Sequence, residues 1–310
     1  MATTNFPNGL SSFGIPLTGD MPNKAYGKRF FVDAKVGVDG RNGRSPDKAF
    51  KTMAEAFQHV SSGDVILVRG KVREQISTPA GVFDVTVIGA SNNPRHADDH
   101  TESDGARGSS GATWTTPAAP TAATPLLIVR QQGWTFENIL FDGPADASCV
   151  QLLRDAGAGD LERDASHAEF SGCRFDGSLI GIENNGGAGF VRVERCRFYR
   201  QTGAGAAGIK TTSTSVAVPL NWNILDSHFA DNASHILSSL SLSLIKGNTF
   251  GKFTGTLSVD VQNNAGQGGD NVITENYLSG TYGVTAYPAG TANEWAGNKN
   301  VAGETTADPI

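Results

Sequence analysis

Two aspartates stand at matching places in a repeated pattern, where their carboxyl groups could do acid–base chemistry. Asp142 and Asp176 each follow a phenylalanine and precede a glycine. If the two copies lie on neighbouring turns of a solenoid, the carboxylates stand roughly 5 Å apart, the separation found in retaining glycosidases. Asp-Gly is also an ordinary turn dipeptide, so the pattern leaves a catalytic pair and a pair of turns as alternatives.

A second polar cluster could bind a metal ion. It contains the side chains of His96, Asp98, Asp99, His100, Glu102 and Asp104. His96, Asp98 and His100 are its candidate ligands, but local density specifies no ligand geometry. We therefore predict a solvated loop, or a loop that contacts a partner. The same prediction applies to the polar group made by Asp160, Glu162, Asp164 and His167.

Motifs of common catalytic sites are missing from the sequence. It contains no Gly-x-Ser-x-Gly elbow and no phosphate-binding loop. The three cysteines have no Cys-x-x-Cys spacing, which argues against a disulfide framework and a zinc site. The sequence thus leans away from an enzyme and predicts no cofactor. We predict that Cys173 and Cys196 are stacked free thiols in the core, and that Cys149 is a small buried residue.

The elements that would position these residues follow from a repeat that begins near Trp134. An apolar residue and two others precede Asn, Cys, Ser or Ile, and one more residue precedes what is usually Phe. The last positions of the seven copies are 141, 175, 198, 229, 250, 278 and 300, a mean spacing of about 26. A repeat of this length is too short for propeller blades and lacks a leucine-rich frame. It predicts an all-β protein, a right-handed parallel β-helix.

Stacked coils bring equivalent residues to within roughly 4.8 Å of one another. The repeat therefore predicts an aromatic ladder in the core, made by Phe141, Phe175, Phe198, Phe229 and Phe250. At a bend it predicts an asparagine ladder, whose amides bond to one another and to turn backbone, made by Asn248, Asn276 and Asn298.

The residues before the repeat predict the start of the same solenoid. Apolar runs at 29–33, 65–68, 85–88 and 126–129 are expected to be strands. Ser45 and Pro46 open a predicted amphipathic helix of about residues 46 to 60, which would cap the exposed end of the core. A long loop is predicted at about 90–124.

Residues 1–27 are predicted to be an extended arm, and residues 28–310 one β-helix domain. The arm is rich in Pro and Gly yet carries the apolar residues Phe6, Leu10, Phe13, Ile15 and Leu17. These would pack either on their own domain or on a neighbouring subunit. The net charge of −6, without a basic tract, predicts no nucleic-acid partner. No signal peptide or membrane span is recognisable, which indicates synthesis and assembly in a cytoplasm.

Five stretches outside the repeat carry a resemblance to a known family: Asn5-Phe6-Pro7-Asn8-Gly9, Phe30-Phe31-Val32-Asp33, Pro94-Arg95-His96-Ala97-Asp98, Gln131-Gln132-Gly133-Trp134 and Arg163-Asp164-Ala165-Ser166-His167. In these stretches the sequence resembles β-helix proteins of the pectate-lyase-like superfamily that are structural proteins of tailed-bacteriophage virions. The likeness extends to about residue 200, and beyond that only the repeat matches. It implies the fold and a virion context, and it supplies no catalytic residues.

The resemblance implies a virion structural protein, foremost a capsid decoration or cement protein or another particle-surface protein. Its expected partners are capsid or other virion proteins bound through the arm, and further copies of itself, with a trimer favoured. No membrane partner is expected. One alternative is a tailspike-like depolymerase of host surface polysaccharide that uses Asp142 with Asp176. The other is a non-catalytic adhesin that stacks sugars of a host glycan on exposed Trp114 and Tyr287.

Overall fold

The protein is described from a computed structural model. The described residues are 11–12, 15–16, 27–90, 111–154, 164–211, 219–251, 259–260, 269–278 and 293–300. Several predicted site residues lie outside these ranges: Phe6, Leu10, Phe13, Leu17, His96, Asp98, His100 and Tyr287. Ile15 lies in β2 (Ile15–Pro16), which pairs antiparallel with β1 (Ser11–Ser12) in a small hairpin of the predicted arm.

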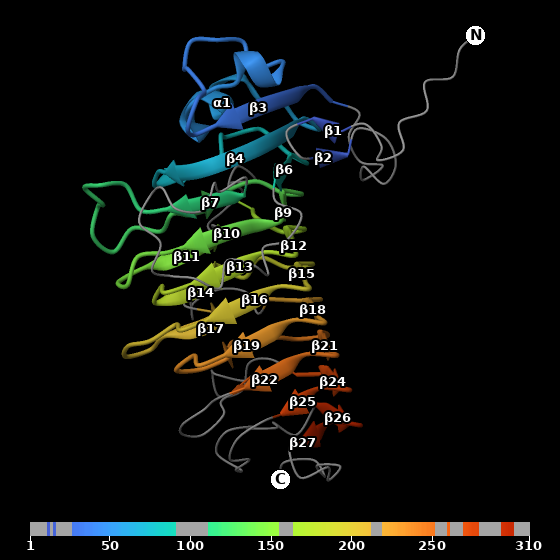
Figure 1. The fold of residues 1–310 in the computed structure, drawn as a ribbon. Helices are drawn as coiled ribbons and strands as arrows, with labels where there is room; N and C mark the ends of the chain where they lie inside the picture. Colours follow the sequence, from blue (N-terminus) through green and yellow to red (C-terminus); the bar gives the residue numbers. More distant parts are fainter. Residues whose placement is uncertain are drawn as a thin grey trace.

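The chain folds as a right-handed parallel β-helix, as the repeat predicts (Figure 1). Its coils follow one another from β3 near the N-terminal end to β27 at the opposite end, and the strands of successive coils pair in parallel. The first face consists of β3 (Arg29–Asp33), β4 (Val65–Arg73), β6 (Thr86–Gly89), β9 (Thr135–Glu137), β12 (Glu169–Ser171), β15 (Arg192–Glu194), β18 (Asn223–Leu225), β21 (Leu244–Lys246), β24 (Val272–Thr274) and β26 (Glu294–Ala296).

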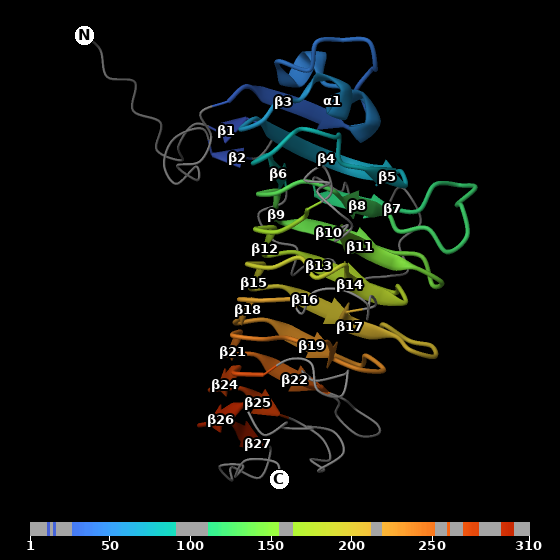
Figure 2. The same ribbon diagram turned by 180° about the vertical axis from the view of Figure 1, so that it is seen from behind.

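Two further faces close each coil. The second face begins with the last residues of β4 and continues in β7 (Ala112–Thr115), β10 (Ile139–Asp142), β13 (Arg174–Asp176), β16 (Arg197–Tyr199), β19 (His228–Ala230), β22 (Thr249–Gly251), β25 (Tyr277–Leu278) and β27 (Lys299–Asn300). The third face, seen in Figure 2, consists of β5 (Ile76–Ser77), β8 (Leu127–Val129), β11 (Ser148–Leu153), β14 (Ile180–Asn185), β17 (Ala207–Thr211), β20 (Ile236–Leu237) and β23 (Val259–Asp260).

The predicted aromatic ladder is confirmed. Its phenylalanines are strand partners in register on the second face, and all are fully buried. The ring centroids of Phe175 and Phe198 lie 4.7 Å apart, and those of Phe198 and Phe229 lie 4.5 Å apart with nearly parallel planes. Stacked rings at this spacing add to the free energy of burial. The first apolar residue of each repeat forms a second buried column, made by Phe136, Phe170, Val193, Ile224, Ile245, Ile273 and Trp295.

The predicted asparagine ladder is also confirmed. The Nδ2 of Asn248 donates to Oδ1 of Asn276 at 3.0 Å, and that of Asn276 donates to Oδ1 of Asn298 at 2.9 Å. Each Oδ1 also accepts a backbone N–H of the preceding coil; that of Ser227, for example, lies 2.9 Å from Oδ1 of Asn248. The amides thereby satisfy backbone groups that the bend between the first and second faces removes from the sheets.

The cap differs from the single predicted helix. Residues 46–60 contain a short 3-10 helix, η1 (Pro46–Lys48), and a separate helix, α1 (Met53–His59). Ser45 makes no side-chain capping bond; Oγ1 of Thr52 caps α1 instead by accepting the Glu55 N–H at 3.1 Å. The helix cannot be continuous because Phe50 is extended, forming a bridge to Val32 at the edge of β3. The apolar face itself is confirmed, because Ala49, Phe50, Met53, Ala56, Phe57 and Val60 are all buried.

The predicted loop at 90–124 is wrong in its second half, because β7 lies within it. Trp114 of β7 pairs in register with Phe141, and the two ring centroids are 6.0 Å apart. Its indole N–H donates to the backbone oxygen of Glu74 at 2.9 Å. Only 1% of Trp114 is exposed, so it cannot stack on a sugar as the adhesin hypothesis requires. The tryptophan adds one more rung to the aromatic ladder.

The three cysteines are buried free thiols, as predicted. Cys173 and Cys196 occupy equivalent positions on neighbouring coils, where their Sγ–H groups reach the backbone oxygens of Phe136 and Phe170 at 3.4 Å. Burial raises the pKa of Cys149 to about 12, and it raises that of Cys173 as well. Thiols in this environment are inert components of the core.

Candidate functional site

Asp142 and Asp176 lie side by side at the outer edge of the second face. They are register partners on β10 and β13, so the sequence placed them correctly on neighbouring coils. Asp142 is exposed, and its Oδ2 accepts the hydroxyl of Thr115 at 3.1 Å. Asp176 is 2% exposed. The pair therefore combines one solvated carboxylate with one that solvent barely reaches.

Two arginines hold the buried carboxylate of Asp176. Nη2 of Arg174 lies 2.7 Å from Oδ2, and the guanidinium of Arg200 donates to Oδ1 from Nη2 at 2.9 Å and from Nε at 3.1 Å. Arg174 is itself 3% exposed, and its guanidinium lies over the Tyr199 ring at 5.0 Å. Charge-assisted bonds of this kind are strong and fix the geometry of the groups that they join.

This arrangement suits a structural ion pair better than a catalytic dyad. A retaining glycosidase needs one carboxylate free to attack the sugar and one carboxylic acid that can donate a proton. Both oxygens of Asp176 are occupied by guanidinium groups from its own strand and from the start of the next turn. Asp142 alone remains open to solvent, and one carboxylate cannot fill both catalytic roles.

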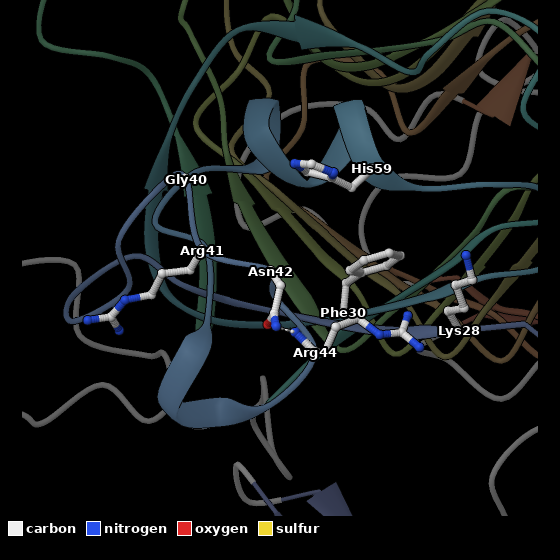
Figure 3. A pocket seen from close by; sticks show the side chains of 7 residues that line it. All are labelled: Lys28, Phe30, Gly40, Arg41, Asn42, Arg44 and His59. Atoms are coloured by element: carbon white, nitrogen blue, oxygen red, sulfur yellow. Dashed lines mark hydrogen bonds between the residues drawn. The ribbon is translucent and has the colours of Figure 1, made fainter.

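A hollow with a volume of about 580 Å³ lies at the N-terminal end of the stack (Figure 3). Three separate segments of the cap line it: residues 28–30, the turn at 40–44, and His59 at the end of α1. Among its lining residues are three side chains that carry or can carry positive charge toward the hollow, Lys28, Arg44 and His59. No Asp or Glu is among the residues that line it.

Aromatic packing holds the basic side chains of the hollow in place. The Arg44 guanidinium lies over the Phe30 ring, 5.0 Å from its centroid, and Phe30 stacks on Phe50 at 6.0 Å. The His59 ring stacks on Phe50 at 5.1 Å, with an interplanar angle of 8°. Arg41 points its guanidinium away from His59, and its Nη1 donates to the backbone oxygen of Asp47 at 2.8 Å.

Charge is distributed unevenly along the chain. Residues 27–60 contain seven Lys and Arg residues and four Asp and Glu residues, a net charge of +3. Since the whole chain carries −6, the remaining residues carry −9. The hollow thus lies in a basic section of a chain whose overall charge is negative, although residues 192–200 on the flank also carry a net charge of +3. The positive charge at this end favours anionic partners.

The candidate metal ligands His96, Asp98 and His100 lie outside the described residues. Within the described ranges, no group of three or more His, Cys, Asp or Glu side chains is arranged to hold a metal ion.

Asp164 and His167, from the other predicted polar group, lie within the described residues. Asp164 loses solvent by burial, yet hydrogen bonds from Ser166 and Gln132 lower its pKa overall. It accepts the Ser166 hydroxyl at 2.6 Å and forms an antiparallel bridge with Arg154, just before the turn at 166–167. No helix in the described part of the chain is long and apolar enough to cross a bilayer.

Solved structures with the same fold include polysaccharide-active enzymes. A pectin methylesterase from Aspergillus niger aligns over 89% of this chain and 87% of its own, with 12% identity and a TM-score of 0.53. An alginate lyase from Paenibacillus sp. aligns over 87% and 95%, with 14% identity and a TM-score of 0.52. A lacto-N-biosidase from Eubacterium ramulus aligns over 88% of this chain but 56% of its own, with 12% identity and a TM-score of 0.55.

These likenesses show a shared parallel β-helix, the pectate-lyase-like fold. At such low identity they carry no activity over, because one fold supports many functions. No family model matches the sequence, and no curated protein matches it either. Function must therefore be argued from the sites of this chain.

Sequence reasoning missed both the arginines around Asp176 and the basic hollow. Arg174 lies two residues before Asp176 on the same strand, so alternation alone places both on the outer side of the coil. That spacing was a usable signal. Arg200 is distant in sequence and reaches Asp176 only because the next coil returns beneath it. The hollow had a weaker signal, the excess of basic residues between 27 and 60.

Proposed function

We propose that this chain is a bacteriophage virion structural protein that decorates the capsid or another particle surface. The observation that carries the proposal is the ion pairing of Asp176 with Arg174 and Arg200. Because both carboxylate oxygens are engaged, Asp176 is not available as the acid or nucleophile of the candidate catalytic pair. The resemblance to phage virion proteins supplies the particle context. A rigid solenoid with continuous stacked ladders suits a protein whose role is mechanical and adhesive.

We further propose that copies associate side by side, with a trimer favoured. Exposed apolar side chains occur at or near the start of the first face on successive coils, at Phe190, Leu220, Leu242 and Val272, and we call these four the apolar stripe. Polar Asn221 and Asp270 occupy the positions equivalent to Phe190 and Leu242 on the other coils. The adjoining first face carries charges of both signs, including the pairs Arg192 with Glu194 and Lys246 with Glu275. A face of mixed charge does not repel a second copy, and burying the stripe would favour association.

Mass spectrometry and electron imaging of purified particles test the virion assignment. We expect the chain at a fixed copy number on the particle surface. A protein lacking residues 1–27 is expected to stay folded but to lose attachment, because these residues hold the predicted apolar anchors. Particles without the chain, or unchanged attachment after the deletion, would contradict the respective statements.

An enzymatic assay tests the depolymerase alternative. Purified protein is incubated with capsule and lipopolysaccharide from a panel of hosts, and the products are examined for new reducing ends or unsaturated sugars. The proposal expects neither product. Cleavage that is lost in Asp142→Asn would overturn it and restore the enzyme hypothesis. Analytical ultracentrifugation of the wild type and of Leu242→Asn tests the association through the apolar stripe, and equal association would refute it.

A further inference from the structure

The hollow at the N-terminal end combines three features of an anion-binding site. It is a recess between three segments, it is lined by Lys28, Arg44 and His59, and none of its lining residues is Asp or Glu. The neighbouring Glu55 carboxylate lies 3.3 Å from Nε2 of His59 and accepts the Gly40 N–H at 3.2 Å, so Lys28 and Arg44 supply the positive charge available to a ligand. Arg44 is pre-positioned by the Phe30 ring beneath its guanidinium, which reduces the entropy lost on binding. Asn42 supports the same loop, since its Oδ1 accepts the Arg44 N–H at 3.1 Å.

The end of the stack differs in charge from its flank. The +3 charge of residues 27–60 contrasts with a summed charge of −9 for the rest, so an acidic surface is attracted to this end, while the flank carries both a basic run at residues 192–200 and most of the acidic residues. An oriented approach of this kind places the solenoid upright on its partner. The predicted anchoring residues 1–27 enter the fold next to Lys28, at the same end.

We propose that this basic hollow receives acidic side chains of a polypeptide, so that the N-terminal end of the solenoid docks onto an acidic protein surface. This inference rests on the proposed function, because it names the chemistry of the partner on the particle. Carboxylates of Asp or Glu would bind between Arg44 and Lys28, with bidentate geometry at the guanidinium.

The burial of the aromatic rings favours a polypeptide over an acidic polysaccharide. Sugar rings are commonly held by stacking on an exposed aromatic face. Here Phe30 is 4% exposed and is covered by Arg44, while Phe50 is fully buried. The hollow also lies at the end of the stack, and all its lining residues come from residues 28–59 of the cap, so it does not extend along the coils as a long polymer would.

Binding of a fluorescent poly-L-glutamate probe to the full chain tests the inference without any particle. We expect saturable binding that weakens as salt rises, because exposed charges are screened. The double variant Lys28→Gln with Arg44→Gln should bind at least tenfold more weakly. Its matched control is Lys246→Gln with Arg195→Gln, which removes the same two charges from exposed positions on the flank. Far-UV circular dichroism should be unchanged in both.

The outcomes distinguish a specific site for acidic side chains from an effect of net charge and from a site for acidic polysaccharide. Equal weakening in the two double variants would overturn the inference, because only net charge would then matter. Tighter binding of polygalacturonate than of poly-L-glutamate, lost in the same hollow variant, would assign the hollow to acidic polysaccharide instead. Absence of the chain from purified particles would contradict the proposed virion function. The binding of poly-L-glutamate would still test whether the hollow binds acidic side chains.

Discussion

Replacing Asp176 by asparagine should reveal whether this carboxylate is a structural ion or a catalytic one. The substitution keeps the shape of the side chain but removes its charge from between Arg174 and Arg200. Arg174 is 3% exposed, so its guanidinium would remain buried without its carboxylate at 2.7 Å. Breaking a buried pair by removing one partner costs about 3–5 kcal/mol.

The magnitude follows from the geometry. At 2.7 Å and an effective dielectric constant of about 20, the attraction between Arg174 and Asp176 is about 6 kcal/mol. Much of this attraction offsets the desolvation of the two groups in the intact protein. In the variant the desolvation of Arg174 remains and the attraction is lost. The half-exposed Arg200 can return to water and adds little. We therefore expect a loss of about 3 kcal/mol in the free energy of unfolding.

Urea denaturation followed by far-UV circular dichroism measures this loss. Asp142→Asn is the matched control, since Asp142 is exposed and its Oδ2 accepts a hydrogen bond from the Thr115 hydroxyl; it should change stability by less than about 0.5 kcal/mol. The paired substitution Arg174→Met with Asp176→Leu should recover most of the loss, because apolar residues of similar volume replace both charges. A loss below about 1 kcal/mol in Asp176→Asn would refute the ion-pair reasoning.

Four further expectations concern the stack itself. Phe198→Leu should cost about 1–2 kcal/mol and Phe198→Ala about 3–5 kcal/mol in urea denaturation, because both remove ring stacking and the second also leaves a cavity; equal costs would contradict the ladder. Leu242→Asn should raise the free energy of unfolding of the monomer by about 0.5–1 kcal/mol, since the backbone there has a φ of +52° and more than half of the side chain is exposed; a loss would show that Leu242 packs in the fold. Burial and the nearby Arg197 lower the pKa of His228, so the unfolded chain binds its proton more readily. The contribution of neutral His228 to stability is therefore fully present above the ordinary pKa of about 6.5 and is lost as pH falls through the pKa of the folded protein. In His228→Asn the melting temperature should depend less steeply on pH between pH 7 and pH 5. The same pH dependence in the variant and the wild type would contradict this. All three thiols should resist Ellman's reagent in the native protein and react after denaturation, because burial shields them from the reagent; rapid native reaction of any one would contradict its burial.

Much of the fold was readable from the sequence because a parallel solenoid converts sequence period into spatial contact. Residues that recur at the same place in each repeat must stack, whatever the length of the loops between them. Phe141 and Phe175 are separated by a longer coil than Phe175 and Phe198, yet both pairs are in register. Repeat position alone was therefore sufficient to predict the ladder.

The errors occurred where no second copy of a pattern existed for comparison. The cap is built once, and only pairing of Phe50 with the edge of β3 divides the predicted helix into η1 and α1. The residues around Trp114 do not show the repeat pattern, so the sequence does not reveal that β7 belongs to the ladder. In both places a tertiary contact outweighed the local pattern, as weak local propensities allow.

The sequence by itself determined the architecture, the aromatic and asparagine columns, and the adjacency of Asp142 and Asp176, because each follows from register between equivalent coils. Only the tertiary structure decided what the two carboxylates can do. Arg200 reaches Asp176 from the following coil, and the basic hollow forms where three separate segments of the cap converge. Such contacts depend on the path of non-repeating segments in space, and no period in the sequence encodes that path.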